Sequence, residues 1–220
     1  MYNELLFLAH ILLVSGTVLW GLLFSYGALI SILGLQLIFA NLFVTKQIML
    51  FGIETTCSEV FIVSGMYGIS LIRYYYTDAR ARRAIWETFG FLLLFVCLTQ
   101  FHCAYDGIDA DMSRMIAQLC STGLRMLLAS FLAYVVSERV HLILTRLLGG
   151  ATSSVASVGA VIGGQLVDTL VFAFAGLYGL VDDVWQIIMF TLLIKGVIIL
   201  LLAPLLAGTK RFVIVGKNEF

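Results

Sequence analysis

Hydrophobic residues fill long stretches of this chain, and the charged residues gather in short segments between them. Each stretch reaches or exceeds the roughly 18–20 residues that a helix needs to cross the hydrocarbon layer of a bilayer. The alternating pattern of a membrane β-barrel strand is absent, so each stretch is predicted to be a helix. Seven segments can be drawn: Leu5–Ser25, Ala28–Leu50, Cys57–Tyr75, Ile85–Ala104, Met115–Glu138, Val155–Leu180 and Val184–Leu206.

These segments predict an all-α fold, a polytopic integral membrane helix bundle with six to seven transmembrane helices. Only Tyr26 and Gly27 separate the first two segments, which predicts a tight hairpin; one long bent helix there would leave six. No repeat, low-complexity stretch or linker interrupts the chain, so residues 1–220 are expected to form a single transmembrane domain. The first ten residues lack a basic region and a cleavage site, which predicts a retained first helix.

The loops between the segments alternate in charge. Basic residues follow the third, fifth and last segments, whereas aspartates dominate after the fourth and sixth. Membrane proteins keep their basic loops in the cytoplasm. With seven helices, the alternation therefore predicts an external N-terminus and a cytoplasmic C-terminus. The basic residues are Arg80, Arg82, Arg83, Arg139, Arg146, Lys210, Arg211 and Lys217, and the acidic ones are Asp106, Asp109, Asp111, Asp182 and Asp183.

Composition narrows the function classes. Of the 220 residues, 61% are hydrophobic and 12% are charged, which is about half the charged fraction of a soluble domain. The 13 basic and 13 acidic residues give a net charge of zero, so the chain has no basic field for nucleic acid. The four cysteines form no CxxC pair and have no histidine at metal spacing. No nucleotide-binding, zinc-protease or hydrolase motif occurs, so no metal, cofactor or enzyme activity is expected.

Three charged residues fall near the middle of predicted helices: Arg125 in the fifth segment, Asp168 in the sixth and Lys195 in the seventh. A charge at bilayer depth is costly unless it is paired or faces water. Two interpretations are open: a substrate or ion pathway, or a structural cluster in which the three charges neutralise one another. Asp168 and Lys195 lie at similar depth on consecutive antiparallel helices, so their side chains are expected to meet near the mid-plane.

Further polar residues lie toward the outer ends of the second and third segments. Lys46 is near the end of the second, with Asn41 five residues earlier, and Glu59 is near the start of the third. Two interpretations are again open, since such side chains either reach a site or extend to the lipid headgroups. The loop Phe51–Thr56, with Gly52, could fold over the site from outside.

The sixth segment has the richest candidate binding surface. Gln165, Asp168 and Phe172 are spaced i, i+3 and i+7, so they share one helical face. A carboxamide, a carboxylate and an aromatic ring on one face can hold a planar polar heterocycle, because the carboxylate accepts two parallel N–H bonds and the ring stacks. Gly159 and Gly163 would let another helix approach this one closely.

Several blocks between Asn41 and Arg211 are typical of one protein family. They are Asn41-Leu-Phe-Val-Thr-Lys46-Gln-Ile-Met-Leu-Phe-Gly52, Thr56-Cys-Ser-Glu59-Val-Phe61, Arg125-Met-Leu-Leu-Ala-Ser130, Gln165-Leu-Val-Asp168-Thr169 with Phe172 and Gly176-Leu-Tyr-Gly179, and Ile194-Lys195 with Pro204. Together these blocks resemble the queuosine precursor transporter family, also called the vitamin uptake transporter family.

The resemblance implies a multi-pass importer of the bacterial inner membrane that works without a cofactor. Its substrates would be 7-deazaguanines for tRNA modification: 7-cyano-7-deazaguanine, 7-aminomethyl-7-deazaguanine or queuine. Its partners would be this 7-deazapurine and the lipid bilayer. Combined with the charge pattern, the resemblance predicts a substrate-binding set of Asp168, Gln165, Phe172, Glu59, Asn41, Lys46, Arg125 and Lys195.

The chain departs from the family pattern at three places. Glu59 stands where the family more often has aspartate. Residues Ser70–Thr77 lack a carboxylate and a glycine of the family pattern, and Ser153–Ser157 replaces a basic residue before the Gln165 block. Which of the three 7-deazaguanines is carried therefore stays open.

Two other functions compete with import by this chain alone. One is a substrate-binding subunit of an energy-coupling vitamin transporter, a class that resembles six-helix proteins with an Ala-xxx-Ala motif in the first helix. Here such motifs occur only late, at Ala129 and Ala203, which argues against that class. The other is a membrane scaffold that transports nothing. The sequence leaves open whether the chain forms a homodimer and whether transport is passive or ion-coupled.

Overall fold

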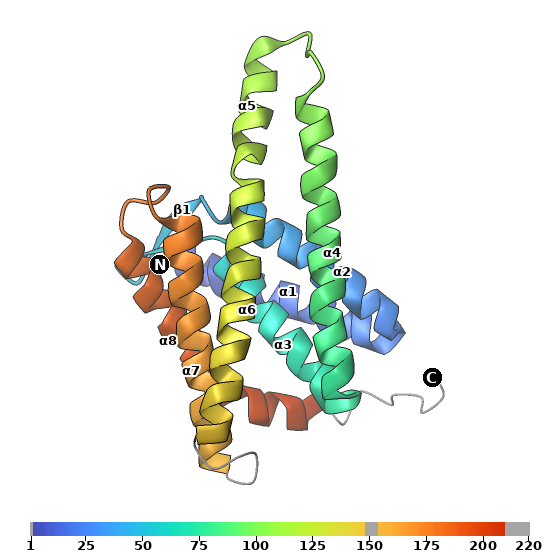
Figure 1. Cartoon of the computed structure of the whole chain (residues 1–220), viewed down its shortest axis with the longest axis vertical. Helices are drawn as coiled ribbons and strands as arrows, with labels where there is room; N and C mark the ends of the chain where they lie inside the picture. Colours follow the sequence, from blue (N-terminus) through green and yellow to red (C-terminus); the bar gives the residue numbers. More distant parts are fainter. Residues whose placement is uncertain (1, 148–153, 210–220) are drawn as a thin grey trace.

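The computed structural model describes residues 2–147 and 154–209, and these form a helical bundle (Figure 1). The predicted all-α class is confirmed. The elements are α1 (Tyr2–Phe24), α2 (Tyr26–Phe43), β1 (Gln47–Leu50), β2 (Ile53–Thr56), α3 (Glu59–Tyr75), α4 (Asp78–Cys103), α5 (Ala110–Ser121), α6 (Gly123–Leu147), α7 (Ser154–Phe172), the π-helical turn η1 (Ala173–Leu177) and α8 (Val184–Thr209).

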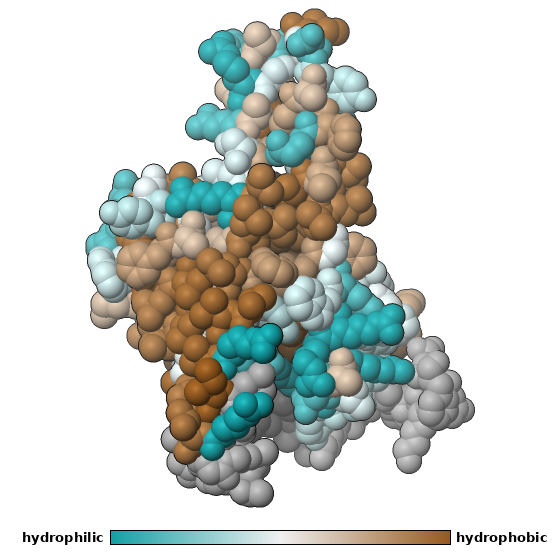
Figure 2. Space-filling view, viewed as in Figure 1, coloured by the Kyte–Doolittle hydropathy of each residue, from teal (hydrophilic) through white to brown (hydrophobic). Residues whose placement is uncertain are grey.

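The outer surface of the bundle is suited to lipid. Within the described ranges, five helices are long and apolar enough to cross a membrane: Tyr2–Phe24, Tyr26–Phe43, Asp78–Cys103, Ala110–His141 and Gly159–Leu177. Large apolar side chains stay exposed along them, and Figure 2 shows hydrophobic residues covering the middle of one face. A soluble protein rarely exposes so large an apolar surface. The chain is therefore a multi-pass membrane protein.

The predicted hairpin between the first two helices is present. Ser25 alone separates α1 from α2, and its hydroxyl oxygen accepts a hydrogen bond from the N–H of Ala28 at 3.1 Å, which caps α2. Gly21 lets the helices approach closely, because a Cβ there would lie 3.1 Å from Leu29 Cα. The missing side chain of Gly21 thus sets how closely α1 and α2 pack.

The second predicted helix is wrong beyond Phe43. Instead of continuing to Leu50, the chain forms a β-hairpin in which β1 and β2 pair antiparallel. Its turn residues, Phe51 and Gly52, have φ values of 53° and 78°. Positive φ at both central residues is typical of tight hairpin turns, and glycine adopts it readily. Hydrophobicity alone does not separate a short apolar strand from the end of a helix.

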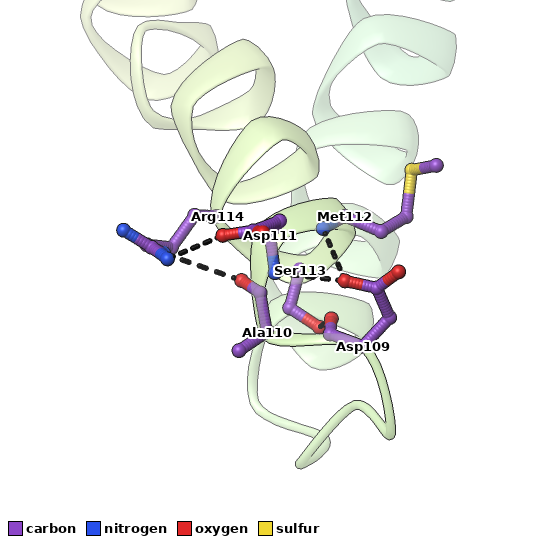
Figure 3. A network of polar contacts seen from close by, with 6 residues as sticks. All are labelled: Asp109, Ala110, Asp111, Met112, Ser113 and Arg114. Carbon is purple, nitrogen blue, oxygen red and sulfur yellow. Dashed lines mark hydrogen bonds and ion pairs between the residues drawn. The ribbon is translucent and has the colours of Figure 1, made fainter.

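The fifth predicted helix is also wrong in its bounds. Helix α5 already begins at Ala110 and ends at Ser121, and α6 begins two residues later. The start is fixed by Asp109, whose Oδ1 accepts hydrogen bonds from the N–H groups of Asp111 and Met112 at 2.9 and 3.0 Å (Figure 3). An aspartate at this position satisfies N–H groups that the first helical turn leaves free. Part of the predicted acidic loop is therefore helical.

Contacts between loops define two ends of the bundle. At one end, the Asn3 amide donates to Met49 O at 3.3 Å, and the N–H of Glu54 donates to Gln186 Oε1 at 3.0 Å. The start of α1, the β-hairpin and the start of α8 therefore lie together. At the other end, the Tyr26 hydroxyl donates to Arg80 O at 3.0 Å, which joins the α1–α2 turn to the start of α4. Figure 1 shows the α4–α5 connection beyond the first of these ends.

Helices α6 and α7 pack against each other along their length (Figure 1). A Cβ at Gly163 would lie 2.3 Å from Leu144 Cδ1, and one at Gly164 would lie 3.2 Å from His141 Cβ. The predicted close approach of another helix is therefore confirmed at Gly163. This packing holds α7 in the bundle with Asp168 facing inward.

We predict that Gly21→Ala lowers stability and Gly16→Ala does not. At Gly21 the added methyl group would crowd the backbone of α2, and overpacking of this kind costs about 1–3 kcal/mol. At Gly16, on the same helix, a Cβ would meet nothing within 4 Å. Thermal unfolding of the purified variants in detergent should show a lower midpoint only for Gly21→Ala. Equal midpoints would contradict the close α1–α2 contact.

Candidate functional site

A cavity of about 270 Å³ lies inside the bundle, between α2, α3, α4, α6, α7 and α8. Its volume is close to that of the smallest typical ligand-binding pockets, and most of its lining is apolar. The polar lining side chains are Gln36, Asn41, Thr56, Ser58, Glu59, Thr88, Ser130, Tyr134, Asp168, Thr169, Thr191 and Lys195. The predicted residues Asp168, Phe172, Glu59, Asn41 and Lys195 are thus brought together around one space.

An ion pair links α7 and α8 at this cavity. Lys195 Nζ lies 2.9 Å from Asp168 Oδ2 and donates a second hydrogen bond to Thr169 Oγ1 at 2.9 Å. The Lys195 side chain is 6% exposed and that of Asp168 is 30% exposed. The two side chains therefore meet, as expected from their similar depth in the two predicted transmembrane helices. Among the described residues, Asp168 Oδ1 has no hydrogen-bond partner, and this oxygen is available to a ligand.

A second carboxylate, Glu59, lies at the start of α3 and is 2% exposed. The Thr191 hydroxyl donates a short hydrogen bond to its Oε1. Its Oε2 is buried and has no hydrogen-bond partner in the part of the chain that the structure describes. Thr191 precedes Lys195 by four residues, so both side chains project from the same face of α8. Helix α8 thus contacts both acidic residues of the cavity.

Two amide side chains on α2 line the opposite wall. Asn41 donates from Nδ2 to Leu37 O at 2.8 Å, and Gln36 donates from Nε2 to Val14 O at 3.2 Å. Each amide oxygen is buried without a donor within the described ranges. Gln36 was not predicted as a site residue. The available signal was an uncharged amide in the middle of an apolar helix, which is weaker than a charge at the same depth.

The aromatic residue Phe172 ends the regular part of α7. Beyond it the chain widens into η1, where the N–H of Tyr178 donates to Ala173 O at 3.0 Å. Single π-helical turns within α-helices are frequent at functional sites. Phe172 and Ala173 both line the cavity, so the change in helix geometry occurs at the cavity wall.

Three predicted residues do not line this cavity. Gln165 lies one turn before Asp168 on α7, but it is not among the lining residues. Arg125 is exposed and donates to the backbone oxygens of Ala175 and Tyr178 at 3.1 and 2.6 Å. Lys46 is exposed in the connection before β1. The predicted cluster of three mutually neutralising charges is thus reduced to Asp168 and Lys195.

The β-hairpin lies at one end of the cavity, as expected for the loop Phe51–Thr56. Thr56 at its end and Ser58 just after it line the cavity, and their hydroxyl oxygens are 2.6 Å apart. The hairpin is held by α1, because Glu4 Oε1 accepts a hydrogen bond from the N–H of Phe51 at 3.2 Å. The hairpin is therefore attached to the first and last helices at this end of the cavity.

We predict that Asp168→Asn lowers the free energy of unfolding by about 3 kcal/mol, because it leaves the buried ammonium of Lys195 unpaired. Lys195→Met should cost less, since the Asp168 side chain is 30% exposed and is therefore less costly to leave unpaired than the 6% exposed Lys195. The double variant should recover most of the loss. Chemical unfolding in detergent measures all three, and wild-type stability of Asp168→Asn would contradict a stabilising ion pair.

Comparisons with known proteins identify a family and a relative of this chain. A relative from Bacillus subtilis (strain 168), named "Probable queuosine precursor transporter", is 28% identical in an alignment 200 residues long. The alignment covers 82% of this chain and 82% of the relative. No solved structure matches the chain. Residues 59–208 match the model of the family described as "Putative vitamin uptake transporter". This match includes α3 to α8 and both acidic residues of the cavity. The chain therefore belongs to this family of membrane transporters.

Proposed function

We propose that this protein imports a queuosine precursor, a 7-deazaguanine, across the bacterial inner membrane for tRNA modification. Three lines support the proposal: the name of the Bacillus subtilis relative, the family blocks in the sequence and the chemistry of the cavity. The first two lines suggest the substrate class. The cavity supplies the physical reason why such a molecule would bind.

The observation that carries the proposal is an excess of hydrogen-bond acceptors around the cavity. Asp168 Oδ1 has no donor among the described residues, and neither have the buried amide oxygens of Asn41 and Gln36. Buried acceptors without donors are costly, so a ligand rich in N–H groups would compensate them. The guanine-like edge of a 7-deazaguanine presents adjacent N–H donors. Asp168 Oδ1 can accept one of these N–H groups, and a buried amide oxygen can accept another.

Each lining residue has a distinct proposed role. Asp168 accepts the N–H edge of the heterocycle, Phe172 stacks on its ring, and Asn41 accepts a further N–H group. Lys195 orients Asp168 through Oδ2 and leaves Oδ1 free. Gln165, Lys46 and Arg125 are not placed against the substrate in this proposal, because none of them lines the cavity.

The proposed orientation follows from the charges at the two ends. The end near Arg80 also contains Arg82 and Arg83 on the first turns of α4, and we assign it to the cytoplasm. The opposite end contains Asp109, Asp182 and the β-hairpin, and we assign it to the outside. In this orientation the hairpin covers the cavity on the side from which substrate arrives.

We predict that the C-terminus is cytoplasmic, so that a fluorescent protein fused after Phe220 is active and alkaline phosphatase fused there is not. A second reporter inserted between Gly107 and Ile108, in the α4–α5 connection, should be active only outside. Paired fusions to alkaline phosphatase and a fluorescent protein provide the measurement. Phosphatase activity from the fusion after Phe220 would reverse the assignment of both ends.

We predict that the protein restores queuosine to tRNA in a host that lacks its own importer and precursor synthesis. The three 7-deazaguanines are supplied separately, and queuosine is measured by mass spectrometry of digested tRNA. The double variant Asp168→Asn with Lys195→Met removes both charges of the ion pair and so leaves neither unpaired. It should nevertheless reduce uptake at least tenfold, because an acceptor for the N–H edge is lost. The control Asp182→Asn changes an exposed carboxylate outside the cavity.

Two results would contradict this proposal. Wild-type uptake by the double variant, at equal membrane abundance, would exclude Asp168 as the substrate acceptor. Failure of the wild-type protein with all three compounds would exclude the proposed substrate class. Uptake that requires co-purifying ATPase subunits would instead identify the chain as a subunit of an energy-coupling transporter.

A further inference from the structure

We propose that Glu59 is a proton-binding site that couples substrate import to inward proton movement. This inference rests on the proposed function, since it concerns the driving force of the same transport. Glu59 lines the same cavity as the ion pair, and its second carboxylate oxygen has no hydrogen-bond partner among the described residues.

The first observation is the incomplete hydrogen bonding of this carboxylate. Glu59 Oε1 accepts a hydrogen bond from Thr191, whereas Oε2 is buried and receives none within residues 2–147 and 154–209. A buried ionised carboxylate needs donors or a cation for both oxygens. A bound proton removes this need, because it neutralises the group on the oxygen that lacks a donor.

The second observation is the charge balance of the cavity lining. Its charged side chains are Asp168, Glu59 and Lys195, which together leave one excess negative charge. Lys195 contacts Asp168 at 2.9 Å, and no cation lies within ion-pair distance of Glu59 among the described residues. A single uncompensated charge inside a membrane protein is costly. One proton on Glu59 makes the lining neutral.

Other titratable groups near Glu59 do not replace that proton. Lys195 on α8 is paired with Asp168 on α7, and both face the cavity. On α1, His10 packs its ring edge against Phe61, with ring centroids 5.4 Å apart. Lys46, on the connection before β1, is exposed.

The remaining neighbouring helices add no charge to the lining. Helix α2 contains no charged residue. Helices α4 and α6 line the cavity with Ile85, Thr88, Phe89, Ser130, Ala133 and Tyr134, of which only the Tyr134 phenol is titratable. Glu59 is therefore the one cavity carboxylate that forms no ion pair in the described part of the chain.

Geometry favours a proton over a metal cation at this position. One carboxylate oxygen holds a proton without further ligands, whereas a metal cation needs several oxygen ligands together. No group of three or more histidine, cysteine or acidic residues lies close enough to hold a metal in the part of the chain that was searched. The nearby hydroxyls of Thr56 and Ser58 are already hydrogen-bonded to each other.

The arrangement also explains how substrate and proton are linked. Thr191 contacts Glu59 and shares its helical face with Lys195, which in turn holds Asp168. A substrate at Asp168 Oδ1 therefore shifts charge on the same network that contacts Glu59. The step is an acid–base equilibrium: Glu59 takes a proton from the outer side with substrate and releases it to the cytoplasm, with no other bond changed.

Transport by the purified full-length protein in liposomes tests this coupling. The probe is the radiolabelled 7-deazaguanine that restores queuosine, and the membrane potential is held at zero. Exchange of labelled for unlabelled substrate at equal pH needs no driving force. With one proton per substrate, an outside pH one unit below the inside should accumulate substrate about tenfold, and a protonophore should abolish this accumulation.

The outcomes separate the two proposals. Exchange without accumulation under the pH gradient, or accumulation driven by a sodium gradient at equal pH, would overturn proton coupling and leave the proposed function intact. Absence of exchange with every 7-deazaguanine would overturn the proposed function, and the proton inference would fall with it.

A second measurement assigns the proton to Glu59. Infrared difference spectra between alkaline and acidic pH should contain the carbonyl stretch of a protonated carboxyl group in the wild type. Glu59→Gln should lose this band and the accumulation driven by the pH gradient, and Glu59→Asp should keep the band at a shifted frequency. An unchanged band in both variants, or accumulation by Glu59→Gln at the wild-type level, would overturn the assignment.

Discussion

The ion pair between Asp168 and Lys195 is the interaction on which the rest of the site depends. A charged lysine side chain that is 6% exposed inside a lipid-facing bundle is stable only beside an opposite charge. The pair fixes α8 against α7, and this contact positions Thr191 at Glu59 on α3. The consecutive helices α7 and α8 are thereby linked through polar contacts to α3, which is distant in sequence. Because Lys195 contacts only Oδ2 of Asp168, the other oxygen of this cavity-lining residue has no donor among the described residues.

The helices around this pair are held in place mainly by close packing. In a bilayer, helices gain little from burying apolar surface, since lipid is as apolar as leucine. Small residues at the contacts therefore matter: Gly21 admits α2, and Gly163 and Gly164 admit α6. Bulky side chains at these positions would separate the helices and widen the cavity. The glycine contacts and the polar site thus depend on each other, because helix packing sets the distances between the charged side chains.

The sequence predicted the helices and the charged residues of the site better than it predicted backbone detail. Hydrophobic length located the helices, and the cost of intramembrane charge drew attention to Asp168, Lys195 and Glu59, which line one cavity in the structure. It did not reveal that Gln47–Thr56 form a hairpin, because short strands and helix ends share the same composition. Helical spacing also did not show whether Gln165 lines the cavity. Residues on one helical face differ in direction, and the Gln165 side chain does not line the cavity although that of Asp168 does. Gln36 was overlooked because an uncharged amide gives a weak signal.

Arg125 illustrates why an intramembrane charge does not always mark a ligand site. The π-helical turn Ala173–Leu177 alters the backbone pairing at the end of α7. Carbonyl groups freed in this way need donors, because lipid supplies none. Arg125 donates to Ala175 O and Tyr178 O, so its charge is used by the backbone. The turn begins directly after Phe172, at the cavity wall. Arg125 therefore supports the cavity wall from outside the cavity, although it belongs to a sequence block typical of the family.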